Sequence, residues 1–126
     1  VGEARKSFTE AIADVAQTRK VGYGLEADVQ MGPVITAESQ TRIQTLIQQG
    51  VQAGATALVD GRHPTIPNYE QGYFVRPTIL QDVDPMGAIA KTEIFGPVLS
   101  LMHVSTIEAA IALINQGQYG NMACLF

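Results

Sequence analysis

The feature that most constrains this chain is a regular alternation of helix-like segments and short apolar segments, separated by glycine and proline. Apolar residues recur at helical spacing in three segments, residues 2–20, 36–53 and 105–117. Short apolar runs typical of strands occupy residues 56–60, 73–83 and 98–104. Because helices alternate with strands, the sequence predicts an α/β protein with a layered sheet-and-helix architecture.

Capping residues set the expected limits of two helices. Thr36 is the expected N-cap of the helix in 36–53, and Gly54 follows its last turn. Ser105 and Glu108 have the spacing of a capping box at the start of the helix in 105–117. The stripe expected to be buried on the first of these helices consists of Ile43, Leu46, Ile47 and Val51.

The strand candidates differ in where they are expected to lie in the sheet. Pro77 interrupts the run 73–83 and has no amide hydrogen to donate, so this strand is expected at an edge or with a bulge. The run 98–104 is apolar on both alternating faces, which predicts a strand in the middle of a sheet. Residues 122–126 start a further strand, and the glycine- and proline-rich stretches 21–34 and 61–72 are expected to be loops.

Composition limits the classes of function. A chain of 126 residues is the size of about one domain. The net charge of -4, with 8 scattered Lys and Arg residues, argues against nucleic acid as a partner. No apolar stretch approaches the roughly 20 residues that cross a bilayer, which argues against a membrane protein. One cysteine and two histidines do not make a zinc ligand set, so no metal site is expected.

Two apparent motifs have structural interpretations that we prefer. The sequence "GYGLEA", residues 22–27, fits the letters of a dinucleotide-binding fingerprint. However, a helix is expected before it where a strand is required, and the acids that follow would repel phosphate. Cys124 has no neighbouring base in the sequence and lies in an apolar run, so we interpret it as a small core residue and not as a nucleophile.

The remaining polar candidates also favour structural roles. His103 lies in an apolar run and is expected to be hydrogen-bonded within the fold, whereas His63 is expected to be exposed in a loop. Asp82 and Asp84 flank a turn at Pro85, where short acidic side chains commonly bond their own backbone.

The segment "KTEIFGPVLS", residues 91–100, has a chemical interpretation as well as a structural one. Phe95 precedes a Gly-Pro pair, so a sharp turn is expected to leave its ring at a rim. A carboxylate such as that of Glu93 accepts two hydrogen bonds from vicinal ribose hydroxyls, and a ring forms a wall for a flat heterocycle. The alternative is a surface glutamate beside a core phenylalanine, and local chemistry alone leaves both open.

The same segment closely resembles the glutamate-isoleucine-phenylalanine-glycine-proline segment of the aldehyde dehydrogenase superfamily. Further stretches resemble successive segments of that superfamily in the same order, so that the resemblance covers essentially the whole chain. Residues 60–79, "DGRHPTIPNYEQGYFVRPTI", are most similar to the methylmalonate-semialdehyde dehydrogenase branch, which is acylating and uses coenzyme A. The other stretches are residues 31–61, 72–80 and 119–126.

The resemblance implies an NAD-dependent oxidation of a small aldehyde through a cysteine thioester. In this branch coenzyme A releases the thioester, so methylmalonate or malonate semialdehyde would give propionyl-CoA or acetyl-CoA. Glu93 would hold the hydroxyls of the nicotinamide ribose, and Phe95 would pack against the nicotinamide side. Members of the family form homo-oligomers, here by resemblance a tetramer, in the bacterial cytoplasm or the mitochondrial matrix.

The resemblance also implies what residues 1–126 do not contain. The family's nucleophilic cysteine and its NAD-binding domain belong upstream, and the rest of the catalytic domain belongs downstream. We therefore expect a partial catalytic domain that is inactive by itself, with no catalytic residue of its own. Two alternatives stay open: a hydrolytic aldehyde dehydrogenase that yields a carboxylic acid, and a stand-alone binding or scaffold module without chemistry.

Overall fold

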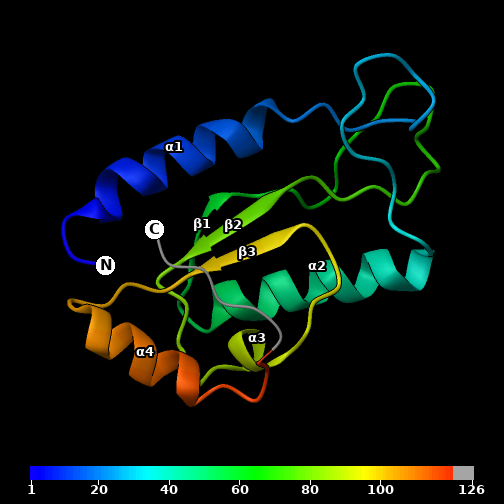
Figure 1. Ribbon diagram of the computed structural model, residues 1–126. Coiled ribbons are helices and arrows are strands. Elements are labelled where there is room, and N and C mark those ends of the chain that lie inside the picture. Colours follow the sequence, from blue (N-terminus) through cyan, green and yellow to red (C-terminus); the bar gives the residue numbers. More distant parts are fainter. Residues whose placement is uncertain (121–126) are drawn as a thin grey trace.

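The computed structural model describes residues 1–120 and shows helices layered against a small sheet (Figure 1). The predicted α/β class is confirmed. The predicted further strand in residues 122–126 and the prediction for Cys124 lie outside the described residues. In chain order the elements are α1 (Ala4–Thr18), α2 (Ala37–Gln52), β1 (Thr56–Val59), β2 (Thr78–Gln81), α3 (Ala88–Lys91), β3 (Val98–Leu101) and α4 (Ile107–Asn115).

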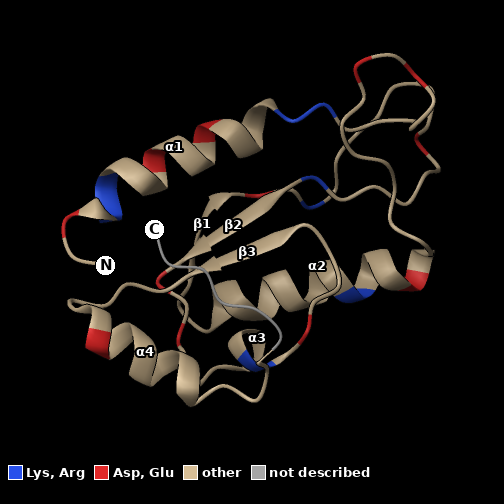
Figure 2. Cartoon of the chain, in the orientation of Figure 1, with Lys and Arg blue, Asp and Glu red and all other residues tan. Residues whose placement is uncertain are grey.

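The sheet has the order β1-β2-β3, with β1 antiparallel and β3 parallel to the central strand β2. Thr78 of β2 is opposite Val98 of β3, and Gln81 is opposite Leu101. Figure 1 shows α1 on one side of the sheet and α2 with α3 on the other. Figure 2 shows that the three strands carry no charged side chain, whereas Lys and Arg are scattered over helices and loops.

The main core lies between the sheet and the α2 and α3 layer. The Thr36 hydroxyl accepts a hydrogen bond from the Ser39 amide at 3.1 Å, which confirms Thr36 as the N-cap of α2. As predicted, α2 ends just before Gly54, and it buries Ile43 and Ile47 fully. The buried residues of this core are Ile43, Ile47, Ala55, Val75, Leu80, Val83 and Ile89.

The predicted place of one strand was wrong, and that of another is not seen within residues 1–120. The strand predicted in 73–83 is central rather than at an edge, because β2 begins at Thr78, after Pro77, and so loses no hydrogen bond to the proline. The strand predicted in the middle, β3, lies at the edge of the sheet formed by residues 1–120, with Leu99 42% exposed. Apolar character on both faces of a strand does not determine how many strands pair with it.

The two helices in the second half of the chain, α3 and α4, also differ from expectation. The N-cap of α4 is Thr106 and not Ser105, because Thr106 has the extended backbone of a cap and its hydroxyl accepts from the Ala109 amide at 3.2 Å. The short helix α3 was not predicted, since four residues carry too little periodicity to be recognised. Residues 21–34 and 61–72 are loops as predicted, apart from an isolated bridge between Val21 and Met31.

The apolar stripe of α1 is only partly covered. Phe8 is 54% exposed, and no residue of α1 is buried. Within residues 1–120, hollows lie between this helix and the sheet, among them one of about 280 Å³ and a second of about 350 Å³. The second is walled by Ile12 and Val15 on one side and by Gly96 and Pro97 on the other. The Gly-Pro turn therefore lies where the α1 layer and the sheet face each other.

Candidate functional site

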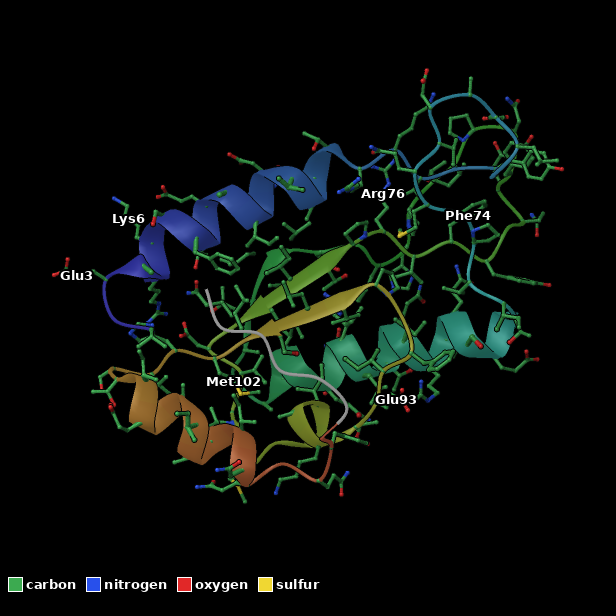
Figure 3. The ribbon with its side chains drawn as sticks, in the orientation of Figure 1. Glu3, Lys6, Phe74, Arg76, Glu93 and Met102 are labelled. Atoms are coloured by element: carbon green, nitrogen blue, oxygen red, sulfur yellow. The ribbon has the colours of Figure 1, made fainter. Side chains whose placement is uncertain are left out.

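The candidate site is the turn of residues 92–97, which joins α3 to β3. The turn passes alongside α2, and the side chain of Glu93 lies on it at the surface (Figure 3). Ile94 points the other way and packs against the main core. One residue of the turn thus anchors it while the residues on either side of Ile94 face solvent.

Arg42 of α2 fixes the first part of this turn. One guanidinium nitrogen donates to the carbonyl oxygen of Ile94 and another to that of Glu93, each at 2.6 Å. A charged donor makes shorter and stronger hydrogen bonds than a neutral one, and the planar fork of an arginine fixes direction as well as distance. The backbone of Glu93 and Ile94 is therefore held against α2 although the Glu93 side chain is exposed.

Phe95 has an unusual backbone conformation. Its φ is +54°, a left-handed value that is rare for a bulky residue and costs about 1–3 kcal/mol. The side chain is 82% exposed, so packing of the ring within residues 1–120 does not offset this cost. The prediction of a sharp turn with the ring at a rim is confirmed. The surrounding contacts must impose the conformation.

The second part of the turn is fixed by a close approach and by the central strand. A Cβ atom added to Gly96 would lie 2.6 Å from Cδ1 of Ile43, so only glycine lets the turn pass α2 at this point. The Pro97 carbonyl accepts from the Thr78 amide at 2.8 Å, and the Val98 amide donates to the Gly96 carbonyl at 2.8 Å. The turn is therefore held on both sides of Phe95.

The exposed groups of the turn are a carboxylate and an aromatic ring. Within the described residues the two ion pairs join Arg5 to Asp82 and Arg62 to Asp60, each at 2.5 Å, and neither uses Glu93. Its carboxylate is thus an exposed acceptor. Two residues away, the Phe95 ring offers an apolar face. Hydrogen-bond acceptance beside a ring suits a ribose attached to a heterocycle better than it suits a phosphate, which a carboxylate repels.

The two aspartates that flank Pro85 have structural roles, as predicted. The Asp84 carboxylate accepts from the Met86 amide at 2.9 Å, which is a local turn bond. Asp82 has a φ of +57° and pairs with Arg5 of α1. The other ion pair is also structural: hydrogen bonds from Arg62 hold the pKa of Asp60 below its usual value.

The histidines and the glycine-rich motif do not join the candidate site. His63 is exposed, as predicted. His103 is exposed too and forms no hydrogen bond within residues 1–120, so the expectation of a hydrogen-bonded His103 was wrong. His103 follows the end of β3 and lines the hollow beneath α1 instead of packing in the core. Residues 22–27 lie in a loop with neither a strand before them nor a helix after them.

The described residues also show no alternative site of two common kinds. Among residues 1–120, no three His, Cys, Asp or Glu side chains are grouped so that they could hold a metal ion. None of the helices in this part of the chain has the length and apolarity required to cross a membrane.

Arg42 is the functional candidate that sequence reasoning missed. It lies on the exposed face of an amphipathic helix, where a charged residue is ordinary. Its partners, the carbonyls of Glu93 and Ile94, lie 51 and 52 residues further along the chain. No local pattern identifies such a contact, since backbone carbonyls carry no signal in the sequence.

Comparison with known proteins gives consistent matches over the chain. The sequence model of the Aldehyde dehydrogenase family matches residues 2–126. A mitochondrial methylmalonate-semialdehyde dehydrogenase [acylating] of Arabidopsis thaliana is 45% identical over 126 residues, which is 100% of this chain and 21% of that protein.

Solved structures agree with the sequence matches. The methylmalonate-semialdehyde dehydrogenase of Oceanimonas doudoroffii has a TM-score of 0.91 and 38% identity, covering 96% of this chain and 25% of that one. The NAD+ complex of an aldehyde dehydrogenase from Bacillus cereus has a TM-score of 0.87 and 34% identity, covering 95% and 24%. The chain therefore spans about a quarter of the length of these relatives.

Proposed function

Because the chain belongs to the aldehyde dehydrogenase family, we propose that the protein oxidises a small aldehyde with NAD and that these residues hold part of the cofactor. The observation that carries the proposal is the turn at Phe95. An exposed ring is kept in a strained backbone conformation, two residues from an exposed carboxylate. Backbone strain of this kind persists where the surrounding structure enforces it, and it is concentrated at functional sites.

Glu93 and Phe95 have separate tasks in this proposal. The Glu93 carboxylate accepts hydrogen bonds from the two hydroxyls of the nicotinamide ribose, because its two oxygens form a fork of acceptors. The Phe95 ring packs against the nicotinamide side and limits rotation of the nicotinamide ring. When bound, NAD supplies the acceptor for the hydride. The residues of this chain contribute orientation, which matters because transfer requires close and aligned contact.

We assign residues 1–126 to part of the catalytic domain. We propose that the nucleophilic cysteine lies outside these residues and that Cys124 takes no part in the chemistry. By the same resemblance, the whole protein is proposed to be a homotetramer, which light scattering of the purified protein would test: a monomer would contradict it. The bacterial cytoplasm and the mitochondrial matrix are the proposed compartments, and the Arabidopsis relative is named mitochondrial.

The proposed substrates are methylmalonate and malonate semialdehyde, with coenzyme A as the acyl acceptor. Support comes from residues 60–79 and from the relatives named methylmalonate-semialdehyde dehydrogenase. A cysteine thiolate would first add to the aldehyde carbonyl; NAD, when bound, would accept the hydride of the resulting thiohemiacetal to leave a thioester, and the thiol of coenzyme A would then displace the cysteine thiolate from that thioester. Loss of carbon dioxide gives propionyl-CoA or acetyl-CoA.

The products of the full-length protein test this assignment. With methylmalonate semialdehyde, NAD and coenzyme A, we expect one propionyl-CoA for each NADH, because the thiol captures the acyl group in place of water. The measurement is absorbance of NADH together with chromatography of the thioester. A reaction without coenzyme A is the control. Equal amounts of a free carboxylic acid with and without coenzyme A would show the hydrolytic reaction instead.

A further inference from the structure

We infer that Arg42 is a positioning residue that orients Glu93 and Phe95 toward the cofactor without touching it. The inference rests on the proposed function of the turn and adds a residue to it. Its basis is the pair of hydrogen bonds from one guanidinium to two successive carbonyl oxygens of the turn.

The two carbonyls that Arg42 binds determine how the neighbouring side chains leave the backbone. The Glu93 carbonyl belongs to the peptide that follows the Glu93 Cα, and the Ile94 carbonyl belongs to the peptide that leads into Phe95. Fixing two adjacent peptide planes fixes φ and ψ of Ile94, which lies between them, and holds one of the two peptide planes at Glu93 and at Phe95. The direction of the Glu93 side chain and the φ of Phe95 are thus both restrained from the Arg42 side.

Arg42 lies on α2, which packs against the main core. The next residue, Ile43, is fully buried in the main core, and its side chain occupies the space that a Cβ atom on Gly96 would need. Arg42 therefore holds the turn before Phe95, and Ile43 limits it just after Phe95. Two adjacent residues of α2 act on the two sides of the strained residue.

The role is orientation rather than stability. Arg42 is exposed, so water competes for its hydrogen bonds and their loss changes the unfolding equilibrium little. The strained φ of Phe95 does depend on the Arg42 hydrogen bonds. Within the described residues the ring is exposed, so its packing does not hold that φ in place. Without the fork, the peptide before Phe95 is free to rotate and the turn relaxes.

The test uses the full-length enzyme with Arg42→Ala, Arg42→Lys and Arg62→Ala. Arg62 is a matched control, because it also joins a loop to α2, through Gln48, at a different place, and pairs with Asp60 of its own loop. The first readout is amide hydrogen exchange of residues 92–98 without NAD, and the second is the affinity for NAD with kcat and KM measured separately. Thermal unfolding is recorded for every variant.

For Arg42→Ala we expect faster exchange in residues 92–98 and a loss of about 10-fold or more in kcat/KM for NAD, since a displacement of about 1 Å can cost up to about 100-fold. Arg42→Lys should fall between Arg42→Ala and the wild type, because an ammonium is a single point donor and lacks the fork. Arg62→Ala should match the wild type in both readouts.

The outcomes separate this inference from the proposed function. Hydrogen exchange or NAD kinetics at the wild-type value in both Arg42→Lys and Arg42→Ala would overturn the role of Arg42. If Arg42→Ala does not fold, wild-type values in Arg42→Lys are sufficient to overturn it. In an enzyme that carries both Glu93→Gln and Phe95→Ala, Arg42→Ala should have a much smaller effect on NAD kinetics, because Arg42 acts through these two side chains. Normal NAD kinetics in Glu93→Gln and Phe95→Ala would instead refute the cofactor role of the turn.

Discussion

Replacing Glu93 with glutamine is expected to lower kcat/KM for NAD by about 10- to 100-fold while leaving the fold intact. Glutamine has the same shape but keeps only one acceptor oxygen and no charge, so it cannot accept from both ribose hydroxyls in the same way. Because Glu93 is exposed and its side chain is outside the core, unfolding should change little. Steady-state kinetics with varied NAD and thermal unfolding measure the two effects.

The control for this substitution is Glu10→Gln, which makes the same chemical change at another exposed residue, on α1. It should leave NAD kinetics at the wild-type value. An enzyme with Glu93→Gln that keeps a normal dependence on NAD would contradict the ribose role and favour an ordinary surface glutamate. A loss of stability without a change in turnover per folded molecule would also contradict the ribose role and would show a structural role for Glu93.

Replacing Leu80 with alanine is expected to lower the free energy of unfolding by about 2–5 kcal/mol. Leu80 is 0% exposed and lies in the central strand β2, where it packs under α2: its Cδ1 would be 3.2 Å from a Cβ added to Gly50. Truncation removes buried methyl groups and leaves a cavity between the sheet and the helix. Urea-induced unfolding of the full-length protein measures the loss.

Leu25→Ala is the matched comparison for Leu80→Ala, because Leu25 lies in a loop and is 84% exposed in residues 1–120. This variant should unfold within about 0.5 kcal/mol of the wild type. If Leu80→Ala were equally mild, the position of β2 at the centre of the packed layers would be wrong.

Local chemistry allowed several parts of the fold to be predicted from the sequence. The start of α2 at Thr36 and its end before Gly54 depend on neighbours within a few residues, and both predictions are confirmed. The exposed turn at Phe95 followed from the Gly-Pro pair after it, and the structure shows it with a left-handed φ. Even so, a one-residue difference between Ser105 and Thr106 shows how loosely a capping pattern fixes a helix start.

Contacts between distant segments were less predictable. The central place of β2 and the outer place of β3 in the described sheet depend on which strands pair, and the strand sequences report only which faces are apolar. The hydrogen bonds of Arg42 join residues more than 50 positions apart. The cofactor roles of Glu93 and Phe95 came from family resemblance, since local chemistry left the alternative of a core phenylalanine open.

The most direct test of the central claim is the structure of the full-length enzyme with NAD bound. We expect both Glu93 carboxylate oxygens at hydrogen-bond distance, about 2.6–3.2 Å, from the two hydroxyls of the nicotinamide ribose, with the Phe95 ring against the nicotinamide. The turn should keep its positive φ at Phe95 and its contact with Arg42. A bound NAD whose ribose hydroxyls are held elsewhere, with Glu93 facing solvent, would contradict the account.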